Sequence, residues 1–246
     1  MNLVIPIASN SKFFSIEDYG YPKPLIEIAG KSMIEHVICN LTQDISFKKI
    51  IFIVKQDDCD RYHLDNTLTL LSPINSEIIK LRSDTQGALC SVLLAIDHIG
   101  TAEPLVISNA DQLFDGGISG PIGQFLNSDF DAGCLTFNSV HPRWSYVRVD
   151  HQNLVVEAAE KRPISRHAIA GLYMYKSGLD FVVHGMDSIK HSTNIDGQYF
   201  ISPVFNSYIL ANKKVGHFEV LNDQYHTLYS PKKIGEYEAI LGGDFK

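Results

Sequence analysis

The first half of this chain alternates short apolar runs with amphipathic stretches. The apolar runs have the length of β-strands, are rich in isoleucine, valine and leucine, and cover residues 3–8, 49–55, 77–81 and 105–108. Apolar residues three or four apart, which predict helices, recur over residues 33–41, 57–71 and 88–99. Strands that alternate with helices in this way predict an α/β fold, with a parallel sheet covered by helices on both faces.

The pattern changes in the second half of the chain. Strand-like segments joined by short turns cover residues 132–138, 145–150, 154–159 and 169–175. They predict a mixed or antiparallel extension of the same sheet. Three more helices and one late strand are predicted at residues 179–190, 200–211, 232–241 and 214–220. Because no repeat, linker or low-complexity stretch interrupts these elements, we expect residues 1–246 to form one domain.

Composition argues against several classes of protein. The formal net charge of −7 and the lack of a basic run oppose a nucleic-acid partner. No window approaches the roughly twenty apolar residues that span a bilayer, and the N-terminus lacks the cationic lead of a signal peptide, so we expect no membrane partner. The four cysteines lie far apart in the sequence, which predicts reduced thiols in a cytoplasmic protein.

The N-terminal segment has the order of a nucleotide triphosphate site. An apolar run at residues 3–7 ends in small and polar residues, and Pro22-Lys23-Pro24 follows about fifteen residues later. An amphipathic segment then begins after Gly30. A strand, a loop of phosphate size, a rigid lysine and a helix are a common way to build such a site.

Asp111 follows the buried strand predicted at residues 105–108, within Asn109-Ala110-Asp111. Ligands of open α/β sheets bind beyond the carboxyl ends of strands, and Mg²⁺ prefers a few carboxylate oxygens together with water and phosphate. Asp111 is therefore a candidate metal ligand. The alternative is that it caps the turn that follows.

Two further motifs admit both a functional and a structural interpretation. The pair Glu160-Lys161 and the nearby Gly171 suit an anionic substrate that approaches the backbone, or else form a solvated turn before a strand. Gly87 at a helix start suits a nucleotide base or ribose, or else follows a capping residue, Asp84 or Thr85. No histidine spacing predicts a zinc site.

The order of these motifs along the chain resembles that of the sugar-phosphate nucleotidyltransferases. The resemblance covers nearly the whole sequence and includes Pro-Lys-Pro-Leu-Ile at 22–26, the Asn-Ala-Asp motif, Glu-Lys-Arg-Pro at 160–163 and Gly-Leu-Tyr-Met-Tyr at 171–175. Residues 140–146 (VHPRWSY) and 159–165 (AEKRPIS) are similar to segments of a branch often found with surface-polysaccharide genes.

The resemblance implies a Rossmann-like fold with a mixed, mainly parallel central sheet. It implies that a phosphorylated acceptor, such as a sugar 1-phosphate, attacks the α-phosphate of an NTP and releases pyrophosphate. Homo-oligomers are common in the resembled family. The implied catalytic residues are Lys23 on the phosphates, Asp111 on Mg²⁺ and Lys161 on the acceptor phosphate. The implied substrate-binding residues are Glu160, Lys161, Gly171 and Tyr146, and the implied nucleotide-binding residues are Ala8, Ser9, Asn10, Ser11, Lys12, Gln86 and Gly87.

The sequence departs from the family pattern in two places. The glycine-rich loop, G-x-G-x-R in outline, has Ser9 and Ser11 in place of glycines and Phe13 in place of the arginine. A second metal-binding aspartate is replaced by Thr227, and Asp223 is out of register.

Two alternatives stay open. The first, which Ser9, Ser11 and Phe13 favour, is a catalytically inactive relative that binds a nucleotide or nucleotide-sugar. The second is a glycosyltransferase, which would use a D-x-D metal motif such as Asp129-Phe130-Asp131, although this motif follows a helix-like segment rather than a strand.

Overall fold

The apolar runs predicted as strands form the centre of one β-sheet in the computed structural model of the chain, which describes residues 1–9 and 13–243. The nine strands of this sheet in the described residues are β1 (Asn2–Pro6), β4 (Lys49–Lys55), β5 (Ser76–Leu81), β6 (Leu105–Ser108), β8 (Ala132–Asn138), β9 (Ser145–Val149), β10 (Val155–Glu160), β11 (His167–Tyr175) and β12 (Val215–Glu219). Two smaller sheets pair β2 (Glu27–Ile28) with β3 (Lys31–Ser32), and β7 (Gln112–Phe114) with β13 (Tyr225–Thr227).

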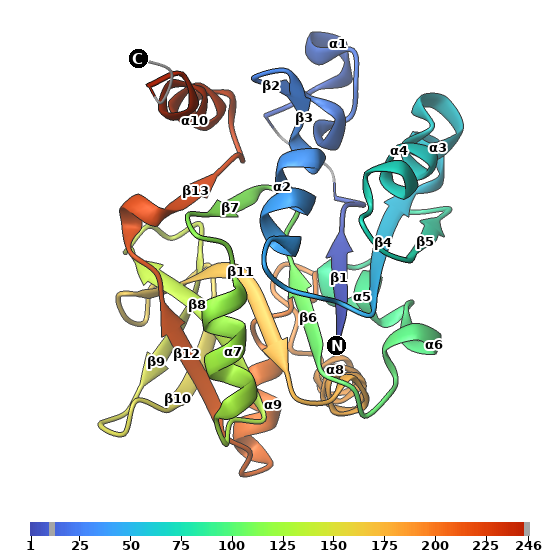
Figure 1. The fold of residues 1–246 in the computed structure, drawn as a ribbon. Coiled ribbons are helices and arrows are strands. Elements are labelled where there is room, and N and C mark those ends of the chain that lie inside the picture. Colours follow the sequence, from blue (N-terminus) through green and yellow to red (C-terminus); the bar gives the residue numbers. More distant parts are fainter. Residues whose placement is uncertain (10–12, 244–246) are drawn as a thin grey trace.

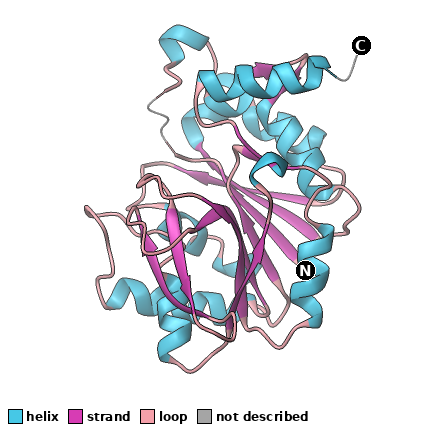
Figure 2. Ribbon diagram, turned by 90° about the vertical axis from the view of Figure 1, so that its left-hand side faces the viewer, coloured by secondary structure: helices cyan, strands magenta, loops and turns pink. Residues whose placement is uncertain are grey.

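Helices cover both faces of the large sheet (Figures 1 and 2). They are α1 (Ile16–Tyr19), α2 (Met33–Thr42), α3 (Gln56–Tyr62), α4 (Leu64–Leu71), α5 (Ala88–Leu93), α6 (Ile96–Ile99), α7 (Ser119–Asn127), α8 (Gly178–Lys190), α9 (Val204–Leu210) and α10 (Pro231–Gly243), with 3₁₀ turns η1 (Lys23–Leu25) and η2 (Asn222–Gln224). The predicted α/β class is confirmed. Within the described residues, no helix combines the length and apolarity needed to cross a bilayer.

Strand direction divides the sheet into the two parts that the sequence predicted. Strands β5, β4, β1 and β6 are parallel neighbours. Strand β11 runs antiparallel to β6 and joins the sheet to β8 and β9, and β10 lies beyond β9. Because β1 and β6 are parallel, the loops that follow them meet at one edge of the sheet.

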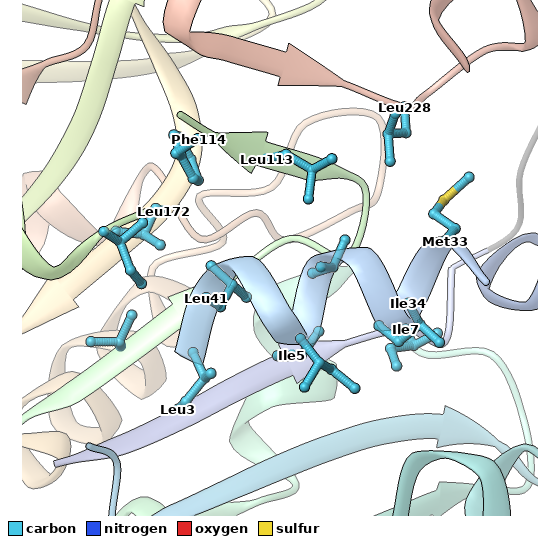
Figure 3. Packing of buried hydrophobic residues seen from close by; sticks show 14 of the residues in the cluster. Leu3, Ile5, Ile7, Met33, Ile34, Leu41, Leu113, Phe114, Leu172 and Leu228 are labelled. Carbon is cyan, nitrogen blue, oxygen red and sulfur yellow. The ribbon is translucent and has the colours of Figure 1, made fainter. Parts of the chain in front are cut away.

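Alternation along β1 explains why both faces of the sheet are covered. Leu3 and Ile5 pack in one apolar cluster, whereas Val4 between them packs in the cluster on the opposite face. Figure 3 shows α2 lying over β1, with Ile34 beside Ile7 and Leu41 toward the Leu3 end of the strand. Burial of such side chains on both faces, at about 25 cal/mol per Å² of apolar surface, stabilises the centre of the sheet.

Two of the predicted helices are each divided into two. The segment predicted as a helix at 57–71 breaks at His63, whose positive φ of 54° ends α3 before α4 begins. The segment predicted at 88–99 breaks after α5, where the amides of Leu94 and Ala95 donate to the carbonyls three residues earlier. Such tightening ends an α-helix without any proline or glycine in the sequence.

Candidate active site

Asp111 lies where the sequence predicts it, just beyond the carboxyl end of β6. Its carboxylate accepts a hydrogen bond from the ammonium of Lys23, and both side chains are about one-fifth exposed. The backbone carbonyl of Asp111 accepts from the Leu228 amide at 2.7 Å, so the loop after β6 is tied to the strand β13 region. Two residues predicted for the phosphates and the metal, 88 positions apart, are thus brought together.

The Pro22-Lys23-Pro24 segment fixes the backbone of Lys23. It forms the turn η1, in which the amide of Leu25 donates to the Pro22 carbonyl at 2.8 Å. Pro22 and Pro24 are buried while Lys23 is half-buried. Proline fixes φ near −65°, so the lysine leaves a rigid turn and loses little backbone freedom when it binds a partner.

A cavity of about 190 Å³ opens beside Asp111. Three residues predicted from the sequence line it, namely Asp111, Glu160 and Gly171. The lining residues that the sequence did not single out as site residues are Asn109, Gln112, Arg143, Trp144, Ser145, Ile169, Tyr173, Thr227 and Tyr229. They come from β6, β7, β9, β11, β13 and the segments beside them, so no local pattern could have collected them.

Glu160 ends β10 and faces the cavity next to Ser145, its partner on β9. Its carboxylate accepts hydrogen bonds from the hydroxyl of Ser145 and, at 2.8 Å, from that of Ser202. Burial raises the pKa of Glu160 above its usual 4.5, although both hydroxyls and the charge of Lys161 oppose the shift. The carboxylate is therefore poised to accept a hydrogen bond from a ligand hydroxyl.

Gly171 is required by close packing in this site. It has a φ of +70°, and a Cβ at this position would lie 1.8 Å from Nε2 of Gln112 and 2.6 Å from Nδ2 of Asn109. The side-chain oxygen Oε1 of Gln112 accepts from the Tyr225 hydroxyl at 2.7 Å, while Nε2 of the same side chain is buried and has no partner in the described part of the chain. This orphaned donor fits an oxygen of a ligand in the cavity.

Tyr146 does not belong to the site, and the prediction that it binds substrate is wrong in this structure. Its side chain is fully buried, and its hydroxyl donates to the His141 carbonyl at 2.7 Å. Successive side chains of a strand point to opposite faces, so Ser145 faces the cavity and Tyr146 the core. The predicted residue, Tyr146, and the residue that lines the cavity, Ser145, differ by one position along β9.

Lys161 is not brought into the cavity either. Its side chain is exposed, and its ammonium lies 4.7 Å from the centroid of the Phe200 ring. Its backbone has a positive φ of 54°, and its amide donates to the Trp144 carbonyl at 3.0 Å. The turn after β10 therefore leaves the ammonium of Lys161 over the Phe200 ring, and Lys161 is not among the residues that line the cavity.

The predicted nucleotide-binding residues are placed in part. Ala8 and Ser9 follow β1, whereas Asn10, Ser11 and Lys12 lie outside the described residues. At Gly87 a Cβ would lie 2.4 Å from the Tyr199 carbonyl oxygen, so close backbone packing accounts for this glycine. Gln86 accepts from the Tyr199 amide at 2.7 Å through its own carbonyl, and neither residue lines the cavity. No side chain caps α5, so the capping interpretation of Asp84 and Thr85 is wrong.

The donor set suits a magnesium ion that shares its coordination with substrate. Within residues 1–9 and 13–243, no three histidine, cysteine or acidic side chains are grouped to hold a metal. Thr227 lines the cavity and pairs across the β7–β13 ladder with Gln112, the residue that follows Asp111. One carboxylate with phosphate oxygens and water is a usual environment for Mg²⁺, so the residues present fit the ion.

The D-x-D motif lies at the other end of the sheet. Residues 129–131 precede β8, which runs parallel to β6 because both are antiparallel to β11. The ammonium of Lys214 pairs with Asp129, and the Lys214 amide donates to Asp131 at 2.8 Å. The motif therefore stands at the amino end of a strand, far from the edge that holds Asp111.

Comparison with known proteins gives a consistent result. A family model described as nucleotidyl transferase matches residues 19–219. The nucleoside-diphosphate-sugar pyrophosphorylase from Vibrio cholerae RC9 superposes with a TM-score of 0.84 at 20% identity, over 96% of this chain and 99% of that chain. No curated protein matches the sequence.

Two other solved structures are similar. A protein assigned as a glucose-1-phosphate thymidylyltransferase from Bacillus anthracis, in complex with a sucrose, gives a TM-score of 0.76 at 18% identity, over 97% of this chain and 94% of that chain. The inositol-1-phosphate CTP transferase from T. maritima gives 0.77 at 14% identity, over 98% and 94%. At these identities the likeness establishes the fold, which is the one that the sequence predicted.

Proposed function

Because the chain belongs to the nucleotidyl transferase family, and is thus a nucleotidyltransferase, we propose that it transfers a nucleotidyl group from an NTP to a sugar 1-phosphate or a similar phosphorylated metabolite. One observation carries the proposal: a single polar cavity joins the Asp111–Lys23 pair of the parallel strands to Glu160 and Gly171 of the antiparallel extension. Similar structures are described as a glucose-1-phosphate thymidylyltransferase and an inositol-1-phosphate CTP transferase, which supports this acceptor class.

The reaction places two anions side by side, so the protein has to align them and neutralise their charge. Lys23 is the cation on the side of the parallel strands, and its rigid turn directs it to the loop after β6. Asp111 is the residue that would hold Mg²⁺, which neutralises phosphate charge when bound. A triphosphate offers Lys23 a more highly charged partner than Asp111, and this exchange frees the carboxylate.

The part of the cavity between Glu160 on β10 and Gln112 on β7 is suited to the acceptor. Glu160 accepts hydrogen bonds, and Nε2 of Gln112 donates them, so the two residues offer complementary partners to a ligand rich in hydroxyl groups. The absence of a side chain at Gly171 leaves room for the amides of Gln112 and Asn109. We assign the sugar or polyol part of the acceptor to this part of the cavity.

The test is an assay of pyrophosphate with each of the four common NTPs, Mg²⁺ and a panel of sugar 1-phosphates and phosphorylated polyols. We expect pyrophosphate only when both substrates are present, together with an equal amount of a nucleotide-activated product identified by mass. Pyrophosphate without an acceptor, or no product with any pair, contradicts the proposal. The similarity of residues 140–146 and 159–165 to a branch found with surface-polysaccharide genes supports a cytoplasmic role in precursor synthesis.

A second candidate function is nucleotide or nucleotide-sugar binding without catalysis. Thr227 favours it, because it lines the cavity without adding a carboxylate beside Asp111. A nucleotide that raises the melting temperature without any pyrophosphate release, across the whole acceptor panel, would support this alternative. The position of residues 129–131 at the far end of the sheet disfavours the glycosyltransferase alternative.

A further inference from the structure

The guanidinium of Arg143 is packed between two aromatic rings at the cavity. Its central carbon lies 3.1 Å from the centroid of the Tyr229 ring and 4.8 Å from that of the Trp144 ring. A guanidinium that contacts aromatic rings through its face keeps its N–H groups at the edge available for other partners. Tyr229, Trp144 and Arg143 all line the cavity that contains Asp111.

The segment that carries Arg143 is fixed by its own hydrogen bonds. The Arg143 amide lies 3.3 Å from Nδ1 of His141, and the Trp144 amide donates to the His141 carbonyl at 3.3 Å. The same carbonyl accepts from the buried Tyr146 hydroxyl. The backbone of Arg143 is therefore held against the core, and its side chain is oriented by the two rings.

Arg143 is the cationic lining residue whose charge the described protein leaves unpaired. No carboxylate within residues 1–9 and 13–243 lies within ion-pair distance of it, and its guanidinium donates no hydrogen bond there. The two carboxylates of the cavity have other partners: Asp111 has Lys23, and Glu160 has two hydroxyls. A half-buried, unpaired guanidinium with its donors free favours an oxyanion, which it can bind through two parallel hydrogen bonds.

We propose that Arg143, rather than Lys161, binds a phosphoryl group in this cavity. The inference rests on the proposed function, which supplies two phosphorylated ligands, the acceptor and the NTP. The buried Nε2 of Gln112, unpartnered in the described chain, is a second donor in the same cavity. Lys161 lies over Phe200 instead.

Trp144, the one tryptophan of the chain, provides a direct measurement of binding. Inorganic phosphate, glucose 1-phosphate, pyrophosphate and Mg-free NTP are titrated separately while tryptophan fluorescence is recorded, with chloride at equal ionic strength as the reference. We expect a saturable change that chloride does not cause. A lower half-saturating concentration for glucose 1-phosphate than for pyrophosphate and NTP assigns Arg143 to the acceptor, and the reverse order assigns it to the nucleotide.

Variants of Arg143 test whether this residue is responsible for the binding of the phosphorylated ligands. Arg143→Met is expected to raise the half-saturating concentration at least tenfold, and Arg143→Lys, which keeps the charge but not the planar fork, to raise it by a smaller factor. Arg148→Met is the matched control, since Arg148 is paired with Glu157 on the same hairpin. Because Arg143 touches the reporter ring, calorimetry with the same ligands has to show the same shift, and circular dichroism has to show a native fold.

Three binding results would overturn the inference. The first is a wild-type half-saturating concentration in Arg143→Met, and the second is no saturable response to any ligand in the wild-type protein. The third is loss of binding in Lys161→Ala with binding retained in Arg143→Met. Anion binding through Arg143 without any pyrophosphate release would contradict the proposed function alone, whereas normal turnover and KM values in Arg143→Met would contradict this inference alone.

Discussion

The two sides of the cavity differ in how their charges are balanced. The β6–β7 wall, formed by Asn109, Asp111 and Gln112, has its carboxylate neutralised by Lys23. In the β9–β10 wall, formed by residues 143–145 and Glu160, the carboxylate accepts its hydrogen bonds in the described chain from hydroxyl groups, and the guanidinium of Arg143 packs on aromatic rings.

This difference implies two modes of binding. A ligand on the β6–β7 wall breaks the existing ion pair between Lys23 and Asp111, so each of these residues exchanges one charged partner for another. A ligand on the β9–β10 wall meets a carboxylate and a guanidinium that are partly desolvated and form no ion pair within the described residues, so the ligand supplies the partners that they lack there. Variants on the first wall should therefore affect metal and turnover most, and variants on the second wall should affect ligand selection and stability.

Asp111→Asn is expected to have the largest effect on turnover. The amide keeps the shape of the side chain but removes the charge that pairs with Lys23 and that we propose to hold Mg²⁺, so the rate of pyrophosphate release should fall roughly 10²–10³-fold. Steady-state assays at saturating NTP and acceptor measure this. Asp129→Asn, a change of the same chemistry in an exposed ion pair with Lys214, should leave the rate unchanged. Equal losses in the two variants would remove the distinction between the walls and the rest of the surface.

Lys23→Met tests whether Lys23 competes with a metal ion for the carboxylate of Asp111. Without the ammonium, Asp111 has no partner in the described protein, so it should bind Mn²⁺ more tightly in the absence of nucleotide, as measured by electron paramagnetic resonance. Turnover should nevertheless fall about 10–100-fold, because a hydrogen bond to a charged group contributes about 1.5–3 kcal/mol. Lys31→Met, on an exposed pair with Glu35, is the control. Unchanged Mn²⁺ affinity in Lys23→Met would show that Lys23 does not compete with the metal.

Thr227→Asp would sharpen the comparison by adding a carboxylate to the cavity. Since carboxylate number sets the affinity of a Mg²⁺ site, the half-saturating Mg²⁺ concentration should fall roughly tenfold. Thr227→Asn is the matched variant, because it has a similar size and no charge. A Mg²⁺ titration of pyrophosphate release compares the two. If both variants shift equally, the effect is steric, and Thr227 does not face the metal.

Gly171→Ala tests the packing that joins the two walls. The new Cβ would meet the amides of Gln112 and Asn109 at a φ of +70°, and strain of this kind costs on the order of 1–3 kcal/mol. For a chain of this size that lowers the melting temperature by roughly 2–4 °C per kcal/mol. Gly197→Ala is a close control, with a φ of +75° and nothing within 4 Å of its Cβ. An equal decrease in the two variants would mean that crowding at Gly171 contributes nothing.

The sequence predicts the β6–β7 wall better than the β9–β10 wall, for a physical reason. Asp111 lies three residues beyond the end of an apolar strand, and the direction of parallel strands places it at the ligand edge. On β9 the prediction depends on which of two neighbouring residues faces the cavity, and the choice of Tyr146 over Ser145 reversed the faces. A period of two residues makes a shift of one position an inversion.

Long-range pairing accounts for the residues that the sequence does not assign to the site. Arg143 reaches the cavity because its guanidinium packs on Tyr229, which lies 86 positions later in the chain. Strands β7 and β13 pair across a still longer separation, 113 positions between Gln112 and Tyr225. Each has three residues, so neither carries a periodic pattern long enough to detect. Only the folded chain brings these segments together.

Glu160→Gln has the smallest expected effect and tests whether the β9–β10 wall stores unfavourable charge. Burial raises the pKa of Glu160, so the folded state holds this proton more tightly than the unfolded state does. The contribution of Glu160 to stability therefore falls as the pH rises from about 4.5 through the raised pKa, and stays low above it. Because glutamine does not ionise, the melting temperature of Glu160→Gln relative to wild type should increase over that range, by a few degrees at roughly 2–4 °C per kcal/mol.

Glu77→Gln provides a control of opposite sign. The hydrogen bond and charge of Lys49, at 3.0 Å, hold the pKa of Glu77 below 4.5, so its stabilising contribution is present above pH 4.5 and is lost as the pH falls through the lowered pKa. The melting temperature of Glu77→Gln relative to wild type should therefore decrease as the pH rises. Opposite slopes, measured by thermal unfolding between acid and neutral pH, separate a carboxylate that the protein desolvates from one that it pairs. Parallel slopes would mean that Ser145 and Ser202 compensate fully for the burial of Glu160, and that the β9–β10 wall gains nothing from an incoming hydroxyl.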